Sequence, residues 1–210
     1  GTFGDISAWS FFSNKNLSVG EGGMIATKDM DLYQKCKYLR SHGMTVASFD
    51  RMKGRASSYD VVEPGLNYRM DELKAALGLV QLSKLPDANE ARKQIVKRYY
   101  ERLAHIKDIT IPFKNFTKGK PSYHIMPILL AENIDRSTLI SLMQQDGIQT
   151  SIHYPEIQSF TAYKDIVKAT PKSQYVSKYE LTLPLYPTMT IEEVDMVCDS
   201  LEKNLPLAQK

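Results

Sequence analysis

The chain has 210 residues, of which 42% are hydrophobic, 24% are charged and 10% are aromatic, and its formal net charge is +3. This composition is typical of a soluble globular protein with a sizeable core, and the positive charge forms no dense run that would indicate nucleic acid as a partner. No segment has the roughly 18 uncharged apolar residues that a membrane helix needs, so we expect no membrane span.

The first part of the chain predicts two strands and a helix. Residues 7–13 alternate and are rich in aromatic side chains, and residues 22–27 form a second run after a Gly-rich turn. From Asp29, the segment DMDLYQKCKYLRSHG has a capping aspartate, apolar residues at helical spacing and a terminal glycine. The polar residues 45–59 predict a loop. Because the chain opens directly in an apolar, strand-like segment, we expect that an N-terminal portion of the parent protein is missing.

Two helices are predicted for the middle of the chain. Positions 70, 73, 77 and 80 carry Met, Leu, Leu and Val, an apolar stripe at the 3.6-residue period of a helix. Pro86 is expected to break this helix because proline lacks the backbone N–H that the helix needs. A second, amphipathic helix over residues 87–106 would then join two parts of the molecule.

Strands and helices alternate after residue 108, which is typical of a small α/β domain. A helix begins after Asp135, and a last helix begins at Thr190, where Thr190 and Glu193 have the spacing of a capping box. Strands are expected at 109–112, 123–130 and 148–154. We therefore predict two domains, residues 1–107 and residues 108–210.

The two cysteines form no pattern that binds metal or indicates a disulfide framework. Cys36 and Cys198 stand alone in segments with helical character, without a CxxC pair or a Cys/His cluster. We also expect no signal peptide. We expect a reduced, cytoplasmic setting and no metal site.

Lys15 lies in the segment SNKNLSVGEGGM, directly beyond the first predicted strand. Taken alone, it is compatible with a solvated lysine in an ordinary turn, and neither GxxxxGK[ST] nor GxGxxG is present. The end of a buried strand is also a favoured place for a ligand-facing group, where a lysine shielded from water can serve in Schiff-base chemistry. Nearby glycines and the hydroxyls of Ser10 and Ser13 would suit a phosphate. Both interpretations stay open from the residues alone.

Several segments resemble one family in the same order along the chain. SFFSNKNLSVGEGGMIATKD, LRSHGM, GLNYRMDELKAALGLVQLSKL, SYHIMPILL, GIQTSIHYP and LPLYPTMTIEEVD are similar to segments of the DegT/DnrJ/StrS family, aminotransferases that depend on pyridoxal 5'-phosphate (PLP) and act on nucleotide-linked keto sugars. The resemblance covers essentially the whole chain. It implies an α/β fold: the C-terminal portion of the large domain of a fold-type I PLP-dependent transferase, followed by a small α/β C-terminal domain.

The resemblance implies a cofactor site in the first domain. Lys15 stands where the family's lysine bonds to PLP and moves the proton during transamination. Ser10 matches a serine that binds the PLP phosphate, and Asn67 matches an asparagine that reaches the phosphate of the neighbouring subunit's cofactor. Relatives that remove a sugar hydroxyl carry histidine in place of the lysine, so Lys15 favours transamination over a sugar dehydratase.

Four further residues match substrate-side positions. His153 and Tyr154 fall where the family contacts the nucleotide sugar, and both can hydrogen-bond sugar hydroxyls or diphosphate oxygens. Arg69 could neutralise phosphate, and His42 belongs to a family motif near the active site. Simpler alternatives remain: a structural histidine at 153, a surface ion pair for Arg69, a strand serine at position 10 and a helix cap for Asn67. The chain departs from the family at Gln158, near which relatives often carry a second histidine.

The function implied is transfer of an amino group from an amino acid, expected to be glutamate, to a nucleotide-linked keto sugar in aminosugar or polysaccharide biosynthesis. The resemblance also implies a homodimer with shared active sites. The aspartate that pairs with the PLP pyridine nitrogen in full-length relatives would precede residue 1, so we expect the isolated chain to be inactive. The alternatives are a non-catalytic fragment, or a structural partner in a split enzyme.

Overall fold

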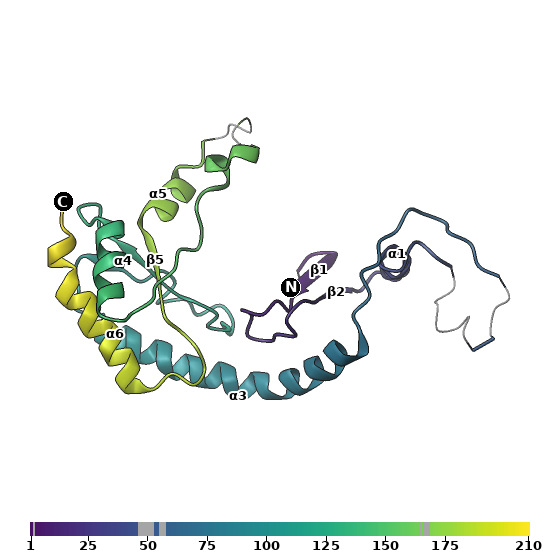
Figure 1. Cartoon of the computed structure of the whole chain (residues 1–210), viewed down its shortest axis with the longest axis horizontal. Helices are drawn as coiled ribbons and strands as arrows, with labels where there is room; N and C mark the ends of the chain where they lie inside the picture. The colour runs from purple at the N-terminus through teal and green to yellow at the C-terminus, as the bar shows by residue number, and fades with distance from the viewer. Residues whose placement is uncertain (2, 46–52, 55–57, 164, 166–168) are drawn as a thin grey trace. The chain divides into compact units, whose positions relative to one another are not determined.

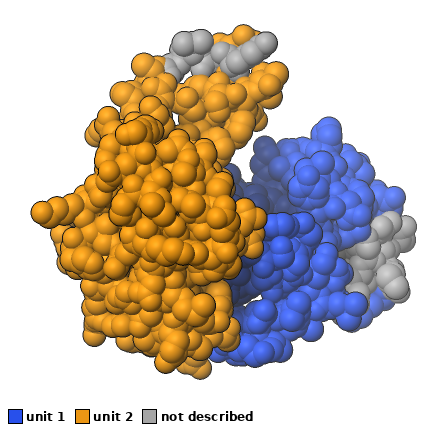
Figure 2. Space-filling view, turned by 60° about the vertical axis from the view of Figure 1, so that its left-hand side comes forward, with its two compact units in different colours: residues 1–85 blue, residues 86–210 orange. Residues whose placement is uncertain are grey.

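The computed structural model describes residues 1, 3–45, 53–54, 58–163, 165 and 169–210. By their contacts the residues form two compact units, unit 1 (Gly1–Leu85) and unit 2 (Pro86–Lys210), which Figure 2 distinguishes by colour. The boundary between them falls inside helix α3 (Glu72–Arg102). The domain boundary that we predict after residue 107 stays a prediction.

Unit 1 contains a two-stranded antiparallel sheet and helix α1. Strands β1 (Ile6–Ser10) and β2 (Gly23–Thr27) pair in the register Ile6↔Thr27 to Ser10↔Gly23. Helix α1 (Met30–Leu39) begins where the Asp29 side chain accepts hydrogen bonds from the backbone N–H groups of residues 31 and 32. The two strands and the capped helix are confirmed, although β1 ends at Ser10 rather than at residue 13. Part of the predicted 45–59 loop lies outside the described residues.

Helix α3 contradicts the predicted break at Pro86. It runs from Glu72 to Arg102 with Pro86 inside it, so the separate helix predicted over 87–106 is the second part of α3. Proline removes one helical hydrogen bond, but Pro86 and Leu82, whose carbonyl loses its partner, are both exposed, so water can replace that partner. The helix therefore continues through the proline.

Helix α3 begins at a cap that the sequence did not single out. The Asp71 carboxylate accepts a hydrogen bond from the backbone N–H of Lys74 at 2.8 Å. This contact satisfies one of the free N–H groups of the first turn. The alternative role of Asn67 as the cap of this helix is therefore wrong.

Unit 2 is built on a three-stranded antiparallel sheet with the order β3-β4-β5. Figure 1 labels β5 of this sheet together with α4, α5 and α6 of the same unit. Side chains of β4 alternate between buried and half-buried positions, as expected for a strand with one face on the core. Helices α4 and α6 begin at the predicted caps Asp135 and Thr190, and Thr190 and Glu193 form both hydrogen bonds of a capping box. The elements are β3 (Ile109–Thr110), β4 (Met126–Leu130), α4 (Arg136–Gln145), α5 (Pro171–Tyr179), β5 (Glu180–Leu183) and α6 (Ile191–Asn204), with short 3₁₀ helices η1 (Ile157–Ser159), η2 (Thr161–Tyr163) and η3 (Pro206–Ala208).

Three predictions for unit 2 are wrong in detail. The strand expected over 148–154 is reduced to one isolated bridge, Ser151↔Thr182, because the chain then turns away at His153 and Tyr154. The strand expected from residue 123 begins at Met126. The strand expected over 109–112 ends at Thr110. Helix α5 and strand β5 were not predicted, and the one bridge of the 148–154 segment is made to β5.

The core lies in unit 2, between the sheet, the second half of α3, and helices α4 and α6. Tyr99 of α3 is fully buried there; its hydroxyl donates to the carbonyl oxygen of Pro184 at 2.8 Å, and burial raises its pKa. Arg98 and Arg102 of α3 form ion pairs with Asp195 of α6 at 2.7 and 2.8 Å. In unit 1, Val19 is the one buried apolar side chain among the described residues.

None of the described helices combines the length and the apolar character that crossing a membrane requires. The described residues also contain no group of three or more His, Cys, Asp and Glu side chains that could hold a metal ion.

Candidate functional site

Lys15 lies in a turn that the chain makes directly after β1. The backbone N–H of Phe11 donates to the carbonyl oxygen of Gly22 at 2.8 Å, which closes the loop at its base, and the N–H of Lys15 donates to the carbonyl oxygen of Phe12 at 3.0 Å. Lys15 is partly buried. Ser10, the last residue of β1, is exposed, and its hydroxyl oxygen accepts from the backbone N–H of Phe12 at 3.3 Å.

This loop packs against the segment that leads into α3. A Cβ added at Gly22 would lie 2.7 Å from Val19 Cγ2 and 3.0 Å from Met70 Cε, so only glycine fits there without a shift. A Cβ added at Gly78 of α3 would lie 3.3 Å from the other Val19 methyl group. The Lys15 loop is therefore held against residues 70–78, just beyond Asn67.

A second pair of loops brings three other predicted residues together. Ser41 and Asn67 form an isolated antiparallel bridge, and the backbone N–H of His42 donates to the carbonyl oxygen of Leu66 at 2.9 Å. The guanidinium of Arg69 donates to Ser41 Oγ at 3.0 Å. The structure therefore places His42, Asn67 and Arg69 on adjoining segments, all three exposed.

Gly43 is the residue that allows this close approach. Its φ is +69°, in the left-handed region, and an added Cβ would overlap the carbonyl oxygen of Glu63. His42 precedes it with φ of +61°, a conformation that histidine adopts more readily than most residues do. The loop geometry therefore depends on glycine at position 43.

The donor set of unit 1 fits the chemistry of PLP. An aldehyde needs a primary amine, which Lys15 supplies, and a phosphate needs hydroxyl, amide or cationic donors, which Ser10, Asn67 and Arg69 supply. Lys15 is partly accessible, and Ser10, Asn67 and Arg69 are exposed. The residue types therefore fit such a cofactor, and their individual roles stay predictions.

His153 and Tyr154 belong to unit 2, where the chain leaves the bridge to β5. His153 is partly buried; its Nδ1 lies 2.9 Å from Thr182 Oγ1, and its backbone N–H donates to Glu180 Oε2 at 2.8 Å. Tyr154 packs edge-on against the His153 ring, with 4.8 Å between the ring centroids, and is 64% exposed. One ring nitrogen of His153 is thus bound to the protein, and within the described part of the chain Nε2 makes no hydrogen bond.

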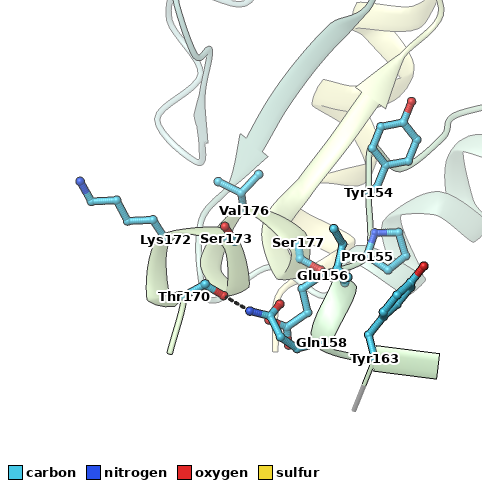
Figure 3. A pocket seen from close by; sticks show the side chains of 11 residues that line it. Tyr154, Pro155, Glu156, Gln158, Tyr163, Thr170, Lys172, Ser173, Val176 and Ser177 are labelled. Carbon is cyan, nitrogen blue, oxygen red and sulfur yellow. Dashed lines mark hydrogen bonds between the residues drawn. The ribbon is translucent and has the colours of Figure 1, made fainter. Parts of the chain in front are cut away.

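Tyr154 also lines a cavity of about 640 Å³ within unit 2 (Figure 3). Residues 154–158 and Tyr163 form one part of its wall, and Ser173, Val176 and Ser177 of α5 form another. Gln158, near the position where relatives often carry a second histidine, donates to Thr170 Oγ1 at 2.7 Å. Gln158 therefore lines this cavity and is hydrogen-bonded to another residue of its wall.

Glu180 and Thr182 contact His153 and were not predicted as site residues from the sequence. Both lie on β5 and are buried, with exposed fractions of 2% and 5%. The signal was present: Tyr179, Leu181 and Leu183 alternate with these two polar residues, a period of two that predicts a strand and places Glu180 and Thr182 on one face.

The predicted site residues thus form two sets, one in each unit. Ser10, Lys15, His42, Asn67 and Arg69 lie in unit 1, and His153 and Tyr154 lie in unit 2.

Comparison with known proteins gives consistent matches along the chain. The model of the DegT/DnrJ/EryC1/StrS aminotransferase family matches residues 1–202. The spore coat polysaccharide biosynthesis protein SpsC of Bacillus subtilis is 34% identical over 212 residues, which is 96% of this chain and 54% of SpsC. The chain therefore spans about half the length of the curated relatives it matches.

Solved structures agree with this match. Helicobacter pylori PseC, an aminotransferase involved in the biosynthesis of pseudoaminic acid, matches 98% of this chain and 54% of its own with a TM-score of 0.89 and 26% identity. The putative sugar aminotransferase Spr1654 of Streptococcus pneumoniae, in its PMP form, matches 99% of this chain and 55% of its own with a TM-score of 0.88 and 28% identity. Spr1654 is also known in a PLP form. The match to the C-terminal half of PLP-dependent sugar aminotransferases confirms the predicted fold class.

Proposed function

The chain belongs to the DegT/DnrJ/EryC1/StrS aminotransferase family, whose aminotransferases use PLP, and we propose that it is the part of a sugar aminotransferase that carries the cofactor lysine. The enzyme would take an amino group from an amino acid, with glutamate as the donor, and transfer it to a nucleotide-linked keto sugar. The name of SpsC supports a product used in polysaccharide biosynthesis. We place the protein in the cytoplasm, in keeping with the free thiols of Cys36 and Cys198.

The observation that carries this proposal is Lys15, partly accessible in the turn after β1 and inside the family match. PLP, when bound, supplies the electron sink that stabilises negative charge on the amino-acid carbon. The Lys15 amine would hold the cofactor covalently and, once released from it, carry the proton at its Nζ between the amino-acid carbon and the cofactor carbon. A lysine at this position favours transamination over removal of a sugar hydroxyl.

The other residues of unit 1 would bind and orient phosphate. The Ser10 hydroxyl would donate to the cofactor phosphate. The Asn67 amide would donate to the phosphate bound by a second copy of the chain, so a homodimer with shared sites follows from this role. Arg69, held by Ser41, would supply positive charge nearby, and His42 would border the same site.

The first test is covalent capture of PLP. The protein is incubated with PLP, reduced with borohydride, digested and analysed by mass spectrometry. We expect the adduct on the peptide that contains Lys15, and none in Lys15→Ala. Lys28→Ala is the matched control, because Lys28 is an exposed lysine just past β2 and should keep the adduct on Lys15. An adduct spread over surface lysines, unchanged in Lys15→Ala, would overturn the proposed role.

A second candidate is a non-catalytic role for these 210 residues alone, as a fragment or as one partner of a split enzyme. It is favoured by the apolar side chains that unit 1 exposes, among them Ile25 at 56% and Leu66 at 55%. The family's aspartate partner for the PLP pyridine nitrogen is also not among these residues. We expect no turnover of glutamate by the 210-residue chain alone, and turnover after a polypeptide carrying that aspartate is added. Appreciable turnover by the chain alone would contradict this.

A further inference from the structure

The side chain of Glu180 is buried and is hydrogen-bonded to His153. Glu180 is 2% exposed, and one of its oxygens accepts the backbone N–H of His153 at 2.8 Å. Its other oxygen accepts a short hydrogen bond from the hydroxyl of Thr182. Thr182 Oγ1 in turn lies 2.9 Å from His153 Nδ1. Glu180, Thr182 and the His153 ring thus form one continuous chain of hydrogen bonds inside unit 2.

The direction of these bonds follows from the number of protons. A carboxylate only accepts, and a threonine hydroxyl has one proton to donate. The guanidinium of Arg136 donates to the Glu180 carbonyl oxygen at 2.8 Å, which brings a positive charge beside the Glu180 carboxylate. Because the Thr182 proton points to Glu180, its oxygen must accept from His153, and Nδ1 must carry a proton.

We propose that Glu180 is a positioning residue that fixes, through Thr182, the Nδ1–H tautomer of His153, so that Nε2 accepts a hydrogen bond from a sugar hydroxyl of the substrate. The neutral ring then has a lone pair at Nε2, which pairs with a hydroxyl proton and not with a diphosphate oxygen, itself an acceptor. The identity of the ligand rests on the proposed function. The tautomer does not, because it follows from contacts within unit 2.

The variant Glu180→Gln separates positioning from a merely structural role. It keeps the size of the side chain and the acceptor that the His153 backbone N–H needs, so the amide NH₂ must face Thr182. Thr182 Oγ1 then accepts from this amide and donates its own proton to His153 Nδ1. The proton of the ring moves to Nε2, which becomes a donor. A residue that only held the loop in place would not reverse the tautomer.

The tautomer can be read from the ring nitrogen shifts of His153 in the ¹⁵N-labelled chain by long-range ¹H–¹⁵N correlation. The chain has 4 histidines, and His153→Gln identifies the signals of His153 by their loss. We expect a protonated Nδ1 in the wild type and in Thr182→Ser, and a protonated Nε2 in Glu180→Gln. Wild-type shifts of an Nε2–H ring, or identical shifts in wild type and Glu180→Gln, would overturn the proposal.

The ligand is tested separately with UDP-glucose and with UDP alone, by titration calorimetry on the wild-type chain and on Glu180→Gln. In Glu180→Gln, Nε2 becomes a donor, so the sugar hydroxyl has to turn and accept from it. The lost orientation should weaken UDP-glucose binding by up to about tenfold and leave UDP unchanged. Equal weakening of both ligands would overturn the assignment to a sugar hydroxyl. Absence of binding to the wild type would count against the proposed function, while the ring shifts would still decide the tautomer.

Discussion

The two units differ in how they hold their predicted site residues in place. All the described buried apolar side chains except Val19 belong to unit 2. Unit 1 instead exposes apolar side chains on the first part of α3, where Leu73 is 85% exposed, Leu77 47% and Val80 51%. Yet unit 1 carries Lys15 and the other predicted cofactor residues, Ser10 and Asn67. Its loops are fixed by backbone hydrogen bonds and close glycine contacts rather than by burial.

This difference teaches that a periodic apolar stripe predicts a helix and an apolar face, but not what covers that face. The stripe at positions 70, 73, 77 and 80 predicted a helix, and the side chains of Leu73, Leu77 and Val80 are exposed on α3. An exposed apolar face of this kind is typical of a surface that binds protein. It agrees with the proposed requirement for a partner polypeptide or a second copy.

The difference in burial between the two units should have its largest effect on the free energy of unfolding when one leucine side chain is truncated in each unit. Leu139→Ala removes a fully buried side chain from unit 2 and should lower the free energy of unfolding by about 3 kcal/mol. Leu73→Ala removes an exposed one from unit 1 and should change it by less than about 0.5 kcal/mol. Urea denaturation of both variants gives the two values. Equal losses would contradict the assignment of the core to unit 2.

Gly43→Ala tests whether local geometry holds unit 1. The left-handed φ alone costs roughly 1–2 kcal/mol for alanine, and the overlap with the Glu63 carbonyl adds to it. Hydrogen exchange should therefore accelerate at the amides of His42 and Leu66, and stay unchanged in unit 2.

The matched control is Gly147→Ala. Gly147 of unit 2 also has a left-handed φ, +83°, but an added Cβ meets nothing within 4 Å. It should cost only the conformational part, roughly 1–2 kcal/mol. A larger cost at Gly147 than at Gly43 would show that the contact with Glu63 is not what matters.

Local signals predicted much of the fold. The caps at Asp29, Asp135 and Thr190 are short-range patterns whose partners lie within three residues, and all three helices begin there. The break at Pro86 was wrong because the cost of a proline depends on whether its helix is supported by packing, and the turns just beyond it lie on the core of unit 2. Strand pairing is likewise non-local, so the sequence did not indicate that β5 pairs with β4 and that the 148–154 segment meets β5 only at Ser151.

In the candidate site, too, local features were predictable from the sequence and non-local contacts were not. The position of Lys15 after a strand was predictable from the alternation of residues 7–13, and His153 was found through the family resemblance. Its contact with Glu180 joins residues 27 positions apart across an isolated bridge, which no periodicity within one segment can reveal. The roles of the site residues remain predictions that the covalent capture experiment addresses first.

A smaller loss of stability is expected at the capping box of α6, a local contact inside unit 2. Thr190→Ala removes the side chain that accepts the Glu193 N–H at 3.2 Å and should cost about 1 kcal/mol. Thr190→Ser keeps the hydroxyl and should stay close to the wild type. Thermal unfolding of the two variants measures the difference, and equal melting temperatures would mean that packing alone fixes the start of α6.

The smallest change in stability near neutral pH is expected where α3 and α6 meet in unit 2. This change is also the one that depends most on pH. Hydrogen bonds from Arg98 at 2.8 and 2.7 Å, with help from Arg102, lower the pKa of Asp195 from 3.8 to about 2. The folded state therefore binds fewer protons than the unfolded state between these values, so the stabilisation is complete above about pH 4 and is lost as the pH falls towards 2.

Asp195→Asn should lower the melting temperature modestly at pH 6, because the side chains of this pair are partly exposed to solvent. The gap from the wild type should close as the pH falls to 2, where Asp195 is protonated and the wild type has lost the same interaction. Val197→Ala is the matched control on the same helix, because it removes buried apolar surface, whose contribution does not titrate, and its gap should persist. A gap for Asp195→Asn that stayed constant with pH would mean that the carboxylate acts through packing and not through its charge.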